Sequence, residues 1–320
     1  MSKKLIAVVG ATGAQGGGLA RAILADGEFA VRALTRDPRS AKAQALAAAG
    51  AEVVAADLDD EASVRAAFEG TYGAFVVTNY WAPRSPEEEA ARTAAEMELF
   101  QAETAARAAR DAAVQHVVWS TLDDTRPFFE GRDDVPWLDD DRYTVPHFDA
   151  KAEADELFTK YAVPTTFLRT TFYFDAFAGG MEPVRGEDGT LTISMPMADK
   201  PLSGIAADDI GRTALAVFKD AGLIGTTLSI AGDHLTGDEY AAALTEALGE
   251  KVAYRPLPWP TYRTLGFPYA VEFSNMFQYY AENHEQFTGD RDLDQVRKLN
   301  PSLQSFTDWL TKHKDAISIK

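Results

Sequence analysis

No cysteine occurs in this sequence of 320 residues. The chain therefore forms no disulfide and offers no thiolate as a nucleophile or metal ligand. The few histidines never stand at the short spacings of zinc-binding motifs; they are His116, His147, His234, His284 and His313. The G-x-S-x-G motif of many serine hydrolases is also missing. We therefore expect neither metal catalysis nor a serine hydrolase.

Long apolar runs and positive charge are scarce too. No stretch approaches the roughly 18 apolar residues of a membrane span, and the N-terminus lacks the apolar core of a signal peptide. We therefore expect a cytoplasmic protein that makes no membrane contact. Lys and Arg number 31 against 49 Asp and Glu, a formal net charge of −18. Because nucleic-acid binding depends on cations that neutralise phosphates, we expect no nucleic-acid partner, and any anion site must be a local basic cluster.

What is present starts with a strand, a glycine turn and a helix. Residues 5–9 are an apolar, β-branched run typical of a parallel strand buried on both faces, and helical periodicity follows over 14–25. Between them, Gly10 permits a tight turn, Gly13 lets the backbone approach a pyrophosphate, and Gly16 lets the helix pack closely on the strand. The free amides at the helix N-terminus suit the same negative charge. We predict a dinucleotide site; the alternative is that these glycines serve only the turn.

The next strand, over 29–34, is followed by basic residues rather than an acid. Readers of NAD place Asp or Glu here to accept from the ribose 2′-hydroxyl, but this chain has Arg36, with Arg39 and Lys42 close behind. A guanidinium suits a 2′-phosphate, so NADP is favoured over NAD. We interpret Asp37 as the N-cap of a helix with Pro38 at its first position.

Strand and helix signals alternate from residue 3 to residue 120. Such alternation predicts right-handed βαβ units, and hence a doubly wound parallel α/β sheet. The expected strands are 52–56, 74–78, 117–120 and 165–168, and the expected helices are 41–49, 61–68, 86–113 and 148–161. Asp57, at a strand end, is placed to accept from the adenine amino group, whereas Asp59 and Asp60 are expected to cap the helix at 61–68.

Two regions depart from this pattern. The acidic, aromatic segment 123–146 is too long for a simple connection, and it is either a lid over the nicotinamide or a surface excursion without a role. After Phe177 glycines and prolines increase and the periodicity weakens. We expect a dinucleotide-binding domain over 1–175, with 205–231 packing back on it, and a smaller, mostly helical substrate or partner lobe over 176–320. Expected elements are a helix at 208–218, a strand at 227–230, helices at 237–248 and 273–280, and a last helix starting at Pro301.

Short motifs along nearly the whole chain resemble the NmrA-like family of atypical short-chain dehydrogenase/reductases, and most of all its HSCARG-type NADPH sensors. They are GATGAQGG at 10–17, TRDPR at 35–39, TNYW at 78–81, PHFDAK at 146–151 and YF at 173–174. The resemblance implies a Rossmann-like fold with NADP(H) as cofactor. It also implies that the TNYW loop lies along the cofactor and that the YF pair clamps it, although the family's following Glu-Asn is Asp175-Ala176 here.

The residue logic and the resemblance together give one predicted set of cofactor contacts. It consists of Gly10, Thr12, Gly13, Ala14, Gln15, Gly16, Arg36, Arg39, Asp57, Leu58, Thr78, Asn79, Tyr80, Lys151, Tyr173 and Phe174. Two of these have a plain alternative: Tyr80 as a packing aromatic, together with Trp81, and Lys151 as an ordinary surface lysine.

The catalytic pattern of short-chain dehydrogenases is incomplete. They use a serine after the fifth strand and a Tyr four residues before a Lys. This chain keeps Ser120 and Lys151, but His147 stands in the tyrosine position. His147 is either a substitute acid or a structural residue.

Two functions therefore remain, and whether the chain is an enzyme at all stays open. The first is a regulator that senses NADPH/NADP⁺ occupancy and passes it to a protein partner, as the resemblance to HSCARG-type proteins implies. The alternative is an NADPH-dependent reductase of a quinone or another small conjugated acceptor. The sequence leaves the oligomeric state open, a homodimer included.

Overall fold

The computed structural model describes residues 3–319, which divide into two compact units. The first contains the chain up to Asp124, His147–Arg169 and Asp208–Leu228, and the second contains Thr125–Pro146, Thr170–Ala207 and the chain from Ser229. This division differs from the predicted boundary at residue 175, since residues 125–146 and 170–175 belong to the second unit. Within residues 3–319 no helix is both long and apolar enough to cross a membrane.

The first unit is built on a seven-stranded sheet with the strand order β11-β6-β5-β4-β1-β2-β3. Its strands are β1 Leu5–Val8, β2 Ala30–Thr35, β3 Glu52–Ala55, β4 Gly73–Val76, β5 His116–Thr121, β6 Thr165–Arg169 and β11 Thr227–Ser229. β1 pairs in parallel with both β2 and β4. The order therefore reverses beside β1, which makes the carboxyl ends of β1 and β4 the topological switch point. The predicted doubly wound parallel sheet is confirmed.

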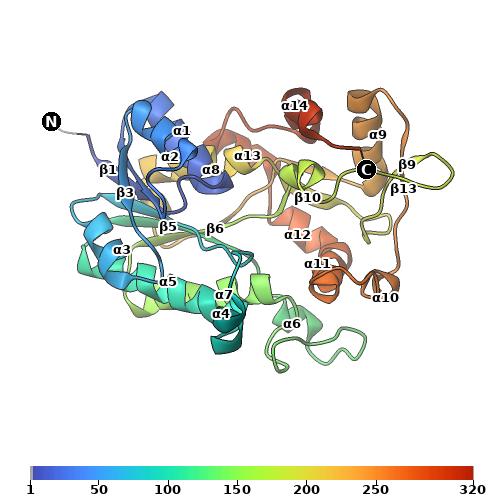
Figure 1. Cartoon of the computed structure of the whole chain (residues 1–320), viewed down its shortest axis with the longest axis horizontal. Helices are drawn as coiled ribbons and strands as arrows, with labels where there is room; N and C mark the ends of the chain where they lie inside the picture. The colour runs from blue at the N-terminus through green and yellow to red at the C-terminus, as the bar shows by residue number, and fades with distance from the viewer. Residues whose placement is uncertain (1–2, 320) are drawn as a thin grey trace. The chain divides into compact units, whose positions relative to one another are not determined.

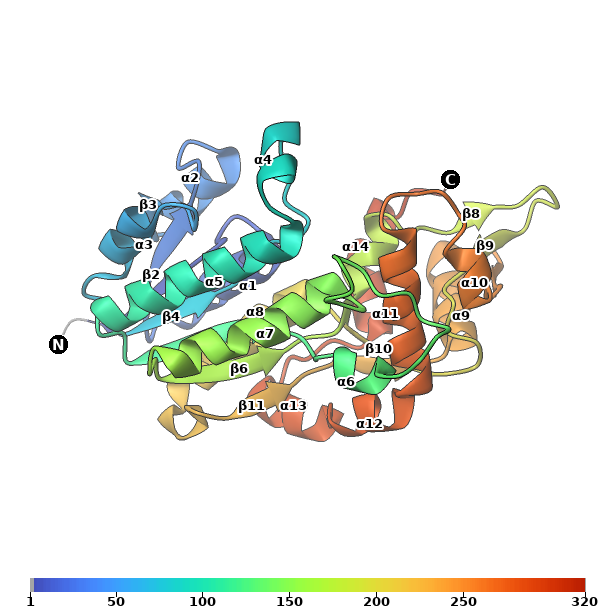
Figure 2. The same ribbon diagram turned by 90° about the horizontal axis from the view of Figure 1, so that it is seen from below.

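Helices cover both faces of this sheet. Figure 1 shows α1, α2 and α8 on one face and α3, α5 and α7 on the other, and Figure 2 shows α5 and α7 side by side. Their bounds are α1 Ala14–Asp26, α2 Ala41–Ala48, α3 Glu61–Phe68, α4 Pro86–Ala91, α5 Ala94–Asp111, α7 Pro146–Lys160 and α8 Ala207–Lys219, with a 3-10 turn η2 at Ala221–Leu223. One face of α5 is rich in fully buried alanines, which pack in one core cluster with Trp119 of β5 and Phe158 of α7.

Glycines bring the backbones of this unit unusually close together. A Cβ on Gly16 would lie 2.5 Å from the carbonyl oxygen of Gly10, and one on Gly211 would lie 2.2 Å from the amide nitrogen of Leu19. Gly10 itself has φ +64°, a conformation that L side chains rarely adopt. The predicted tight turn at Gly10 and close helix packing at Gly16 are confirmed, and Gly211 adds the same kind of contact between α8 and α1.

Two predicted helix starts are wrong, and one predicted helix is interrupted. Ser40, not Asp37, is the N-cap of α2, and its hydroxyl accepts from the amide of Ala43. The expected helix over 86–113 is two helices, because Thr93 takes an extended conformation and starts α5 with a capping box. The last helix begins after Ser305, which forms a capping box with Asp308, rather than at Pro301.

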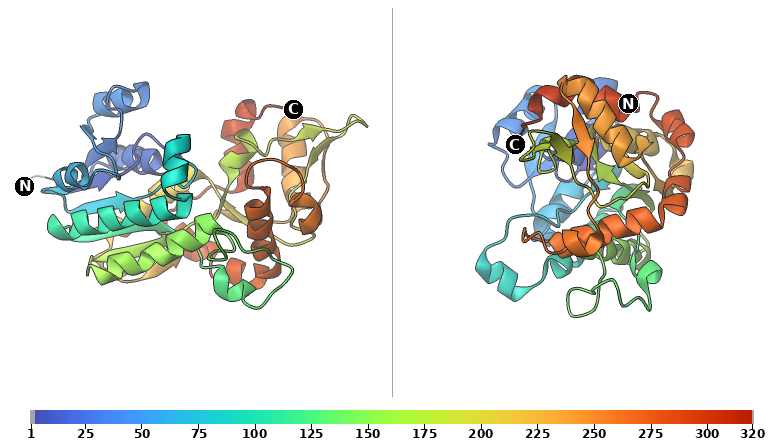
Figure 3. Two further views of the ribbon diagram at one scale, coloured as in Figure 1. Left: turned by 60° about the horizontal axis from the view of Figure 1, so that its bottom comes forward. Right: turned by 90° about the vertical axis from the view of Figure 1, so that its right-hand side faces the viewer.

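The second unit contains two three-stranded sheets, ordered β12-β10-β7 and β13-β9-β8. The strands are β7 Phe172–Tyr173, β8 Val184–Arg185, β9 Leu191–Ile193, β10 Leu202–Ile205, β12 Asp233–Leu235 and β13 Val252–Tyr254. The helices are α6 Arg126–Phe129, α9 Gly237–Leu248, α10 Trp259–Tyr262, α11 Ala270–Glu282, α12 His284–Gly289, α13 Leu293–Leu299 and α14 Phe306–His313, with 3-10 turns η1 Phe174–Ala178 and η3 Lys314–Ala316. Figure 3 shows the β8–β9 hairpin projecting from this unit. The C-terminal region is helical, as expected.

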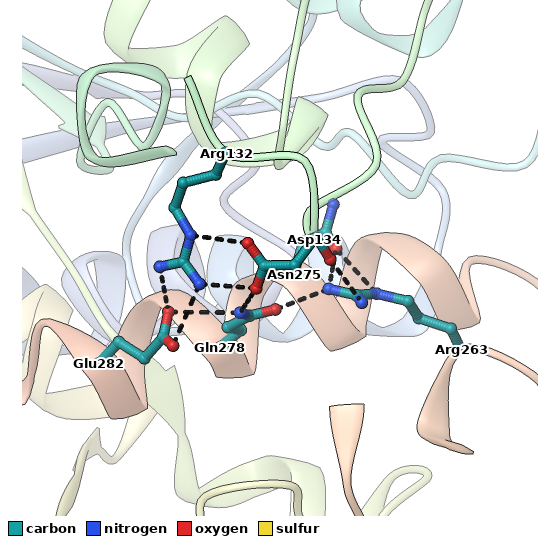
Figure 4. Close-up of polar contacts among 6 residues, drawn as sticks. All are labelled: Arg132, Asp134, Arg263, Asn275, Gln278 and Glu282. Carbon is teal, nitrogen blue, oxygen red and sulfur yellow. Dashed lines mark hydrogen bonds and ion pairs between the residues drawn. The ribbon is translucent and has the colours of Figure 1, made fainter. Parts of the chain in front are cut away.

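Hydrogen bonds and an ion pair join segment 125–146 to α11 within the second unit (Figure 4). The Arg132 guanidinium donates to both carboxylate oxygens of Asp134, at 2.9 and 2.7 Å, and to those of Glu282 on α11, at 2.6 and 3.2 Å. This cation lowers the pKa of Asp134 to about 2. The side-chain amide of Asn275 donates to the carbonyls of Pro136 and Thr144, at 2.9 and 2.8 Å, and so fastens both ends of the intervening loop.

Candidate functional site

The glycine turn leaves the N-terminus of α1 open. Gly10 and Gly13 are exposed, and the amide of Gly13 donates to the carbonyl of Gly10 at 2.8 Å. Gly13 is the N-cap of α1; no side chain caps the helix, and its first turn contains no acidic residue. Because the first amides of a helix have no partner inside it, these groups can bind an anion at the carboxyl end of β1.

One predicted pair of site residues is in direct contact. The Ser120 hydroxyl, at the carboxyl end of β5, donates to Oε1 of Gln15 in the first turn of α1 at 2.7 Å. Ser120 is only 2% exposed. The structure therefore brings Ser120 to the glycine turn, where it orients Gln15.

Several solvent-exposed basic residues follow β2 in the chain. Arg36 is exposed and, among residues 3–319, forms no ion pair or hydrogen bond through its side chain. The Arg39 side chain is 95% exposed and lies 3.9 Å from the carboxylate of Asp37. Lys42 is exposed on the first turn of α2. In a chain with net charge −18, this is the local basic cluster that an anion site needs.

The two predicted site residues in the turn after β3, Asp57 and Leu58, are half-buried. Oδ1 of Asp57 accepts from the amide of Asp59 at 3.1 Å, and the side chain of Leu58 packs on the core. Asp60 caps α3 as predicted. Asp59 does not share that role, because its carboxylate pairs with Arg92 at 2.7 Å.

An aromatic group follows β4. Tyr80 is 7% exposed and Trp81 is 39% exposed, and their rings meet edge to face with centroids 4.8 Å apart. The His147 ring, at the start of α7, lies 5.8 Å from that of Tyr80 and 5.0 Å from that of Trp81. It also meets Phe148 edge to face. His147 is 7% exposed, so its surroundings are those of a packed aromatic ring.

Lys151, on α7, is joined to the end of β4. Its ammonium lies 2.6 Å from the hydroxyl of Thr78 and 2.8 Å from Oε2 of Glu98 on α5. Thr78 and Lys151 were predicted, whereas Glu98 was missed. The one available signal was a lone acid on an α5 face of alanines, which periodicity alone does not interpret.

Another carboxyl group, half-buried, lies one turn along α7. Asp155 accepts from the indole N–H of Trp119 at 2.8 Å. Burial raises the pKa of Asp155 to about 7, although its hydrogen bonds with Thr121 and Trp119 oppose that shift. Sequence reasoning missed this group too, because nothing in the local pattern separates it from the other acidic residues of α7.

The two clamp residues belong to the second unit. The ring of Phe174 is 0% exposed and packs against Tyr240, Phe306 and Trp309. The Phe174 ring therefore has no exposed surface to offer to a cofactor in its predicted clamp role, because long-range packing has drawn it into the core. Tyr173 is half-buried, and Asp175 accepts from the amide of Ala207 at 3.0 Å.

Comparison with known proteins gives a consistent picture. A 288-residue match is 31% identical to the NmrA-like family domain-containing oxidoreductase hkm9 of Aspergillus hancockii, covering 86% of this chain and 82% of that protein. The negative transcriptional regulator NmrA, solved in complexes with NADP and with NAD, matches at TM-scores of 0.76 and 0.75 with 23% identity, over 97% of this chain and 95% of that one.

An NADPH-dependent quinone oxidoreductase of Escherichia coli, solved with NADPH, has a TM-score of 0.70 and 22% identity, covering 96% of this chain and 98% of that one. The model of the NmrA-like family matches residues 2–310. This match spans both compact units. The chain therefore belongs to the NmrA-like family.

Proposed function

We propose that the first unit binds NADP(H). The observation that carries the proposal is the open N-terminus of α1 at the sheet's switch point, with the exposed guanidinium of Arg36, which has no partner among residues 3–319, beyond the neighbouring strand. The exposed amides of the glycine turn would hold the pyrophosphate. Asp57 would accept from the adenine amino group. Asn79, exposed after β4, would border the nicotinamide half.

Arg36 would select the phosphorylated cofactor. A guanidinium can donate two N–H groups to a 2′-phosphate, and its positive charge attracts the negative charge of that phosphate. Arg39 would add a second cation. The neighbours solved with NADP and with NADPH support this choice, although the regulator NmrA was also solved with NAD.

We further propose that the protein is a sensor of NADPH/NADP⁺ occupancy that passes its state to a protein partner. His147 stands where an acid-base tyrosine is expected, and its ring is packed among Tyr80, Trp81 and Phe148. The packed histidine lacks the solvent exposure of a ready proton donor. The likeness to a transcriptional regulator supports this role.

The second candidate is an NADPH-dependent reductase of a quinone or another conjugated acceptor. The oxidoreductase names of relatives, and the likeness to a quinone oxidoreductase, favour it. The bound cofactor would supply the hydride. A conjugated acceptor needs little proton transfer at one fixed oxygen, so the missing tyrosine would matter less.

One experiment separates the two. Calorimetric titration with NADPH is followed by spectrophotometric assays of NADPH oxidation with a panel of quinones and conjugated dyes. Tight binding without steady turnover supports the sensor, whereas sustained turnover with any acceptor supports the reductase. Absence of binding would contradict both.

A further inference from the structure

A buried ion pair joins two helices of the first unit. Nζ of Lys151 on α7 lies 2.8 Å from Oε2 of Glu98 on α5, and the two side chains are 11% and 1% exposed. Buried charges of this kind persist only where close partners replace the lost water. The pair is therefore a specific arrangement rather than an incidental surface contact.

The protons of Lys151 are all accounted for. An ammonium group has three N–H donors and no acceptor. Three acceptors surround it: Oε2 of Glu98 at 2.8 Å, the Thr78 hydroxyl at 2.6 Å and the Thr78 carbonyl at 3.3 Å. No donor is left for a ribose hydroxyl of a cofactor.

The carboxylate depends equally on this arrangement. Oε2 of Glu98 also accepts from the Thr78 hydroxyl at 2.9 Å. The other oxygen, Oε1, is buried and has no hydrogen-bond partner among the described residues. Loss of Lys151 would thus leave a buried charge with one remaining donor, and loss of Glu98 would leave a buried ammonium without its counter-ion.

We propose that Glu98 is a positioning residue that commits Lys151 to the end of β4 instead of to the cofactor. Through Lys151 and the Thr78 hydroxyl, it fixes the backbone where residues 78–81 leave the sheet. This inference rests on the proposed function, in which that loop borders the nicotinamide half of NADP(H). It replaces the predicted contact of Lys151 with the ribose.

The same arrangement changes the electrostatics at position 147. In a Tyr-x-x-x-Lys pair, the lysine charge makes the phenol more acidic. Residues 147 and 151 are four apart on α7 and so neighbours on its surface. Because Glu98 neutralises Lys151, a tyrosine placed at 147 gains no such activation.

A double-mutant cycle on NADPH affinity tests the positioning role. Glu98→Gln and Lys151→Met each leave a buried partner without its counter-charge, so each should weaken binding by about tenfold. The double variant contains no buried charge at either position. Adding Lys151→Met to Glu98→Gln should therefore cost no more than about threefold.

The matched control is Glu103→Gln, which breaks an exposed pair with Lys160 between the same two helices. It should leave NADPH affinity unchanged. The proposal is overturned if Lys151→Met weakens binding equally with and without Glu98→Gln, which is the result of a direct ribose contact. If the wild type fails to bind NADPH, the proposed function fails instead, and the coupling of Glu98 to Lys151 is then measured by thermal unfolding of the same four proteins.

A spectroscopic titration tests whether Glu98 neutralises the charge of Lys151 at position 147. A purely structural ion pair would leave the measured midpoint unchanged. The ultraviolet difference spectrum between His147→Tyr and wild type follows ionisation of the introduced phenol. Adding Glu98→Gln exposes that phenol to an unpaired ammonium and should lower its titration midpoint by about one pH unit or more. Equal midpoints with and without Glu98→Gln would overturn the proposal.

Discussion

The two compact units are stabilised by different kinds of contact. In the first, glycines let backbones touch: a Cβ on Gly16 or Gly211 would overlap main-chain atoms of α1 or of the turn before it. In the second, interlocking aromatic rings fill the interior, with Phe174, Tyr240 and Phe306 fully buried. Substitution of Gly16 or Gly211 therefore acts by blocking backbone space, whereas truncation of these buried rings acts by opening cavities.

This difference separates the site from the scaffold. The anion-binding groups of the first unit are main-chain amides, whose positions depend on the glycines rather than on side-chain identity. The second unit contributes stability through its aromatic core. Changes at the glycine turn should thus affect mainly cofactor affinity, and changes in the aromatic core of the second unit should affect mainly unfolding.

The largest expected effect is on cofactor binding in the first unit. Gly13→Val should reduce NADPH affinity by more than about a hundredfold, because the branched side chain fills the space a pyrophosphate needs. A Cβ there would lie 3.2 Å from the Gly10 carbonyl, a contact that a small shift relieves, so the fold should survive. Calorimetry and circular dichroism measure the two outcomes.

Gly289→Ala in α12 is the matched control, because a Cβ there meets no atom within 4 Å. It should change neither property. Wild-type NADPH affinity in Gly13→Val would show that the glycine turn serves only the backbone.

Phe174→Ala should produce the next largest effect, this time on stability. Removing a buried aromatic ring typically costs about 3–5 kcal/mol of unfolding free energy. Because the ring lies in the core of the second unit, NADPH affinity should stay within about threefold of wild type while the protein remains folded. Urea denaturation and calorimetry test both parts. Loss of affinity without loss of stability would restore Phe174 to the cofactor clamp.

Asp155 should make the first unit sensitive to pH. Its folded pKa of about 7 lies above the ordinary value of 3.8, so the folded protein binds the proton more tightly than the unfolded chain does. This contribution to stability is complete below about pH 4 and is lost as the pH rises through 7. Asp155→Asn should remove the part of that decline that falls between pH 5 and 8, about 3 kcal/mol. Urea denaturation of wild type and variant at pH 5 and at pH 8 measures this difference in unfolding free energy. If the unfolding free energies of both proteins change equally between the two pH values, the prediction is wrong and Asp155 has an ordinary pKa.

The smallest expected effect belongs to His147. General acid catalysis contributes roughly 10²–10⁴ to turnover, so loss of a true proton donor would be obvious. We expect His147→Ala to leave any residual quinone reduction within about threefold of wild type, because the ring is a packed aromatic. A hundredfold loss of turnover with intact NADPH binding would favour a dedicated reductase over a sensor.

The regular part of the first unit was predictable because its signals are local. Buried parallel strands read as apolar runs, and α3 spans Glu61–Phe68 as predicted. The sequence analysis missed the break between α4 and α5, because no Gly or Pro follows Pro86 in this segment. Thr93 and Glu96 nevertheless form a capping box, and this sequence signal marks the start of α5. Strands as short as Phe172–Tyr173 carry no periodicity at all and escaped prediction.

The candidate site was predictable only in part, for a related reason. The glycine turn and Arg36 follow strands that the sequence marks, so their place at the sheet's carboxyl edge could be inferred. The partner of Lys151 could not, because Glu98 lies on another helix and meets it only through the fold. Burial of Phe174 likewise results from contacts with residues far along the chain.

Cofactor discrimination by Arg36 is the most direct test of the account. Calorimetric titrations measure the affinities of wild type and of Arg36→Asp for NADPH and for NADH. The account predicts that wild type prefers NADPH and that the variant loses roughly ten- to hundredfold in NADPH affinity while NADH improves relative to it, because a charge-assisted pair becomes repulsive. Unchanged NADPH affinity in Arg36→Asp would contradict the assignment of the 2′-phosphate site.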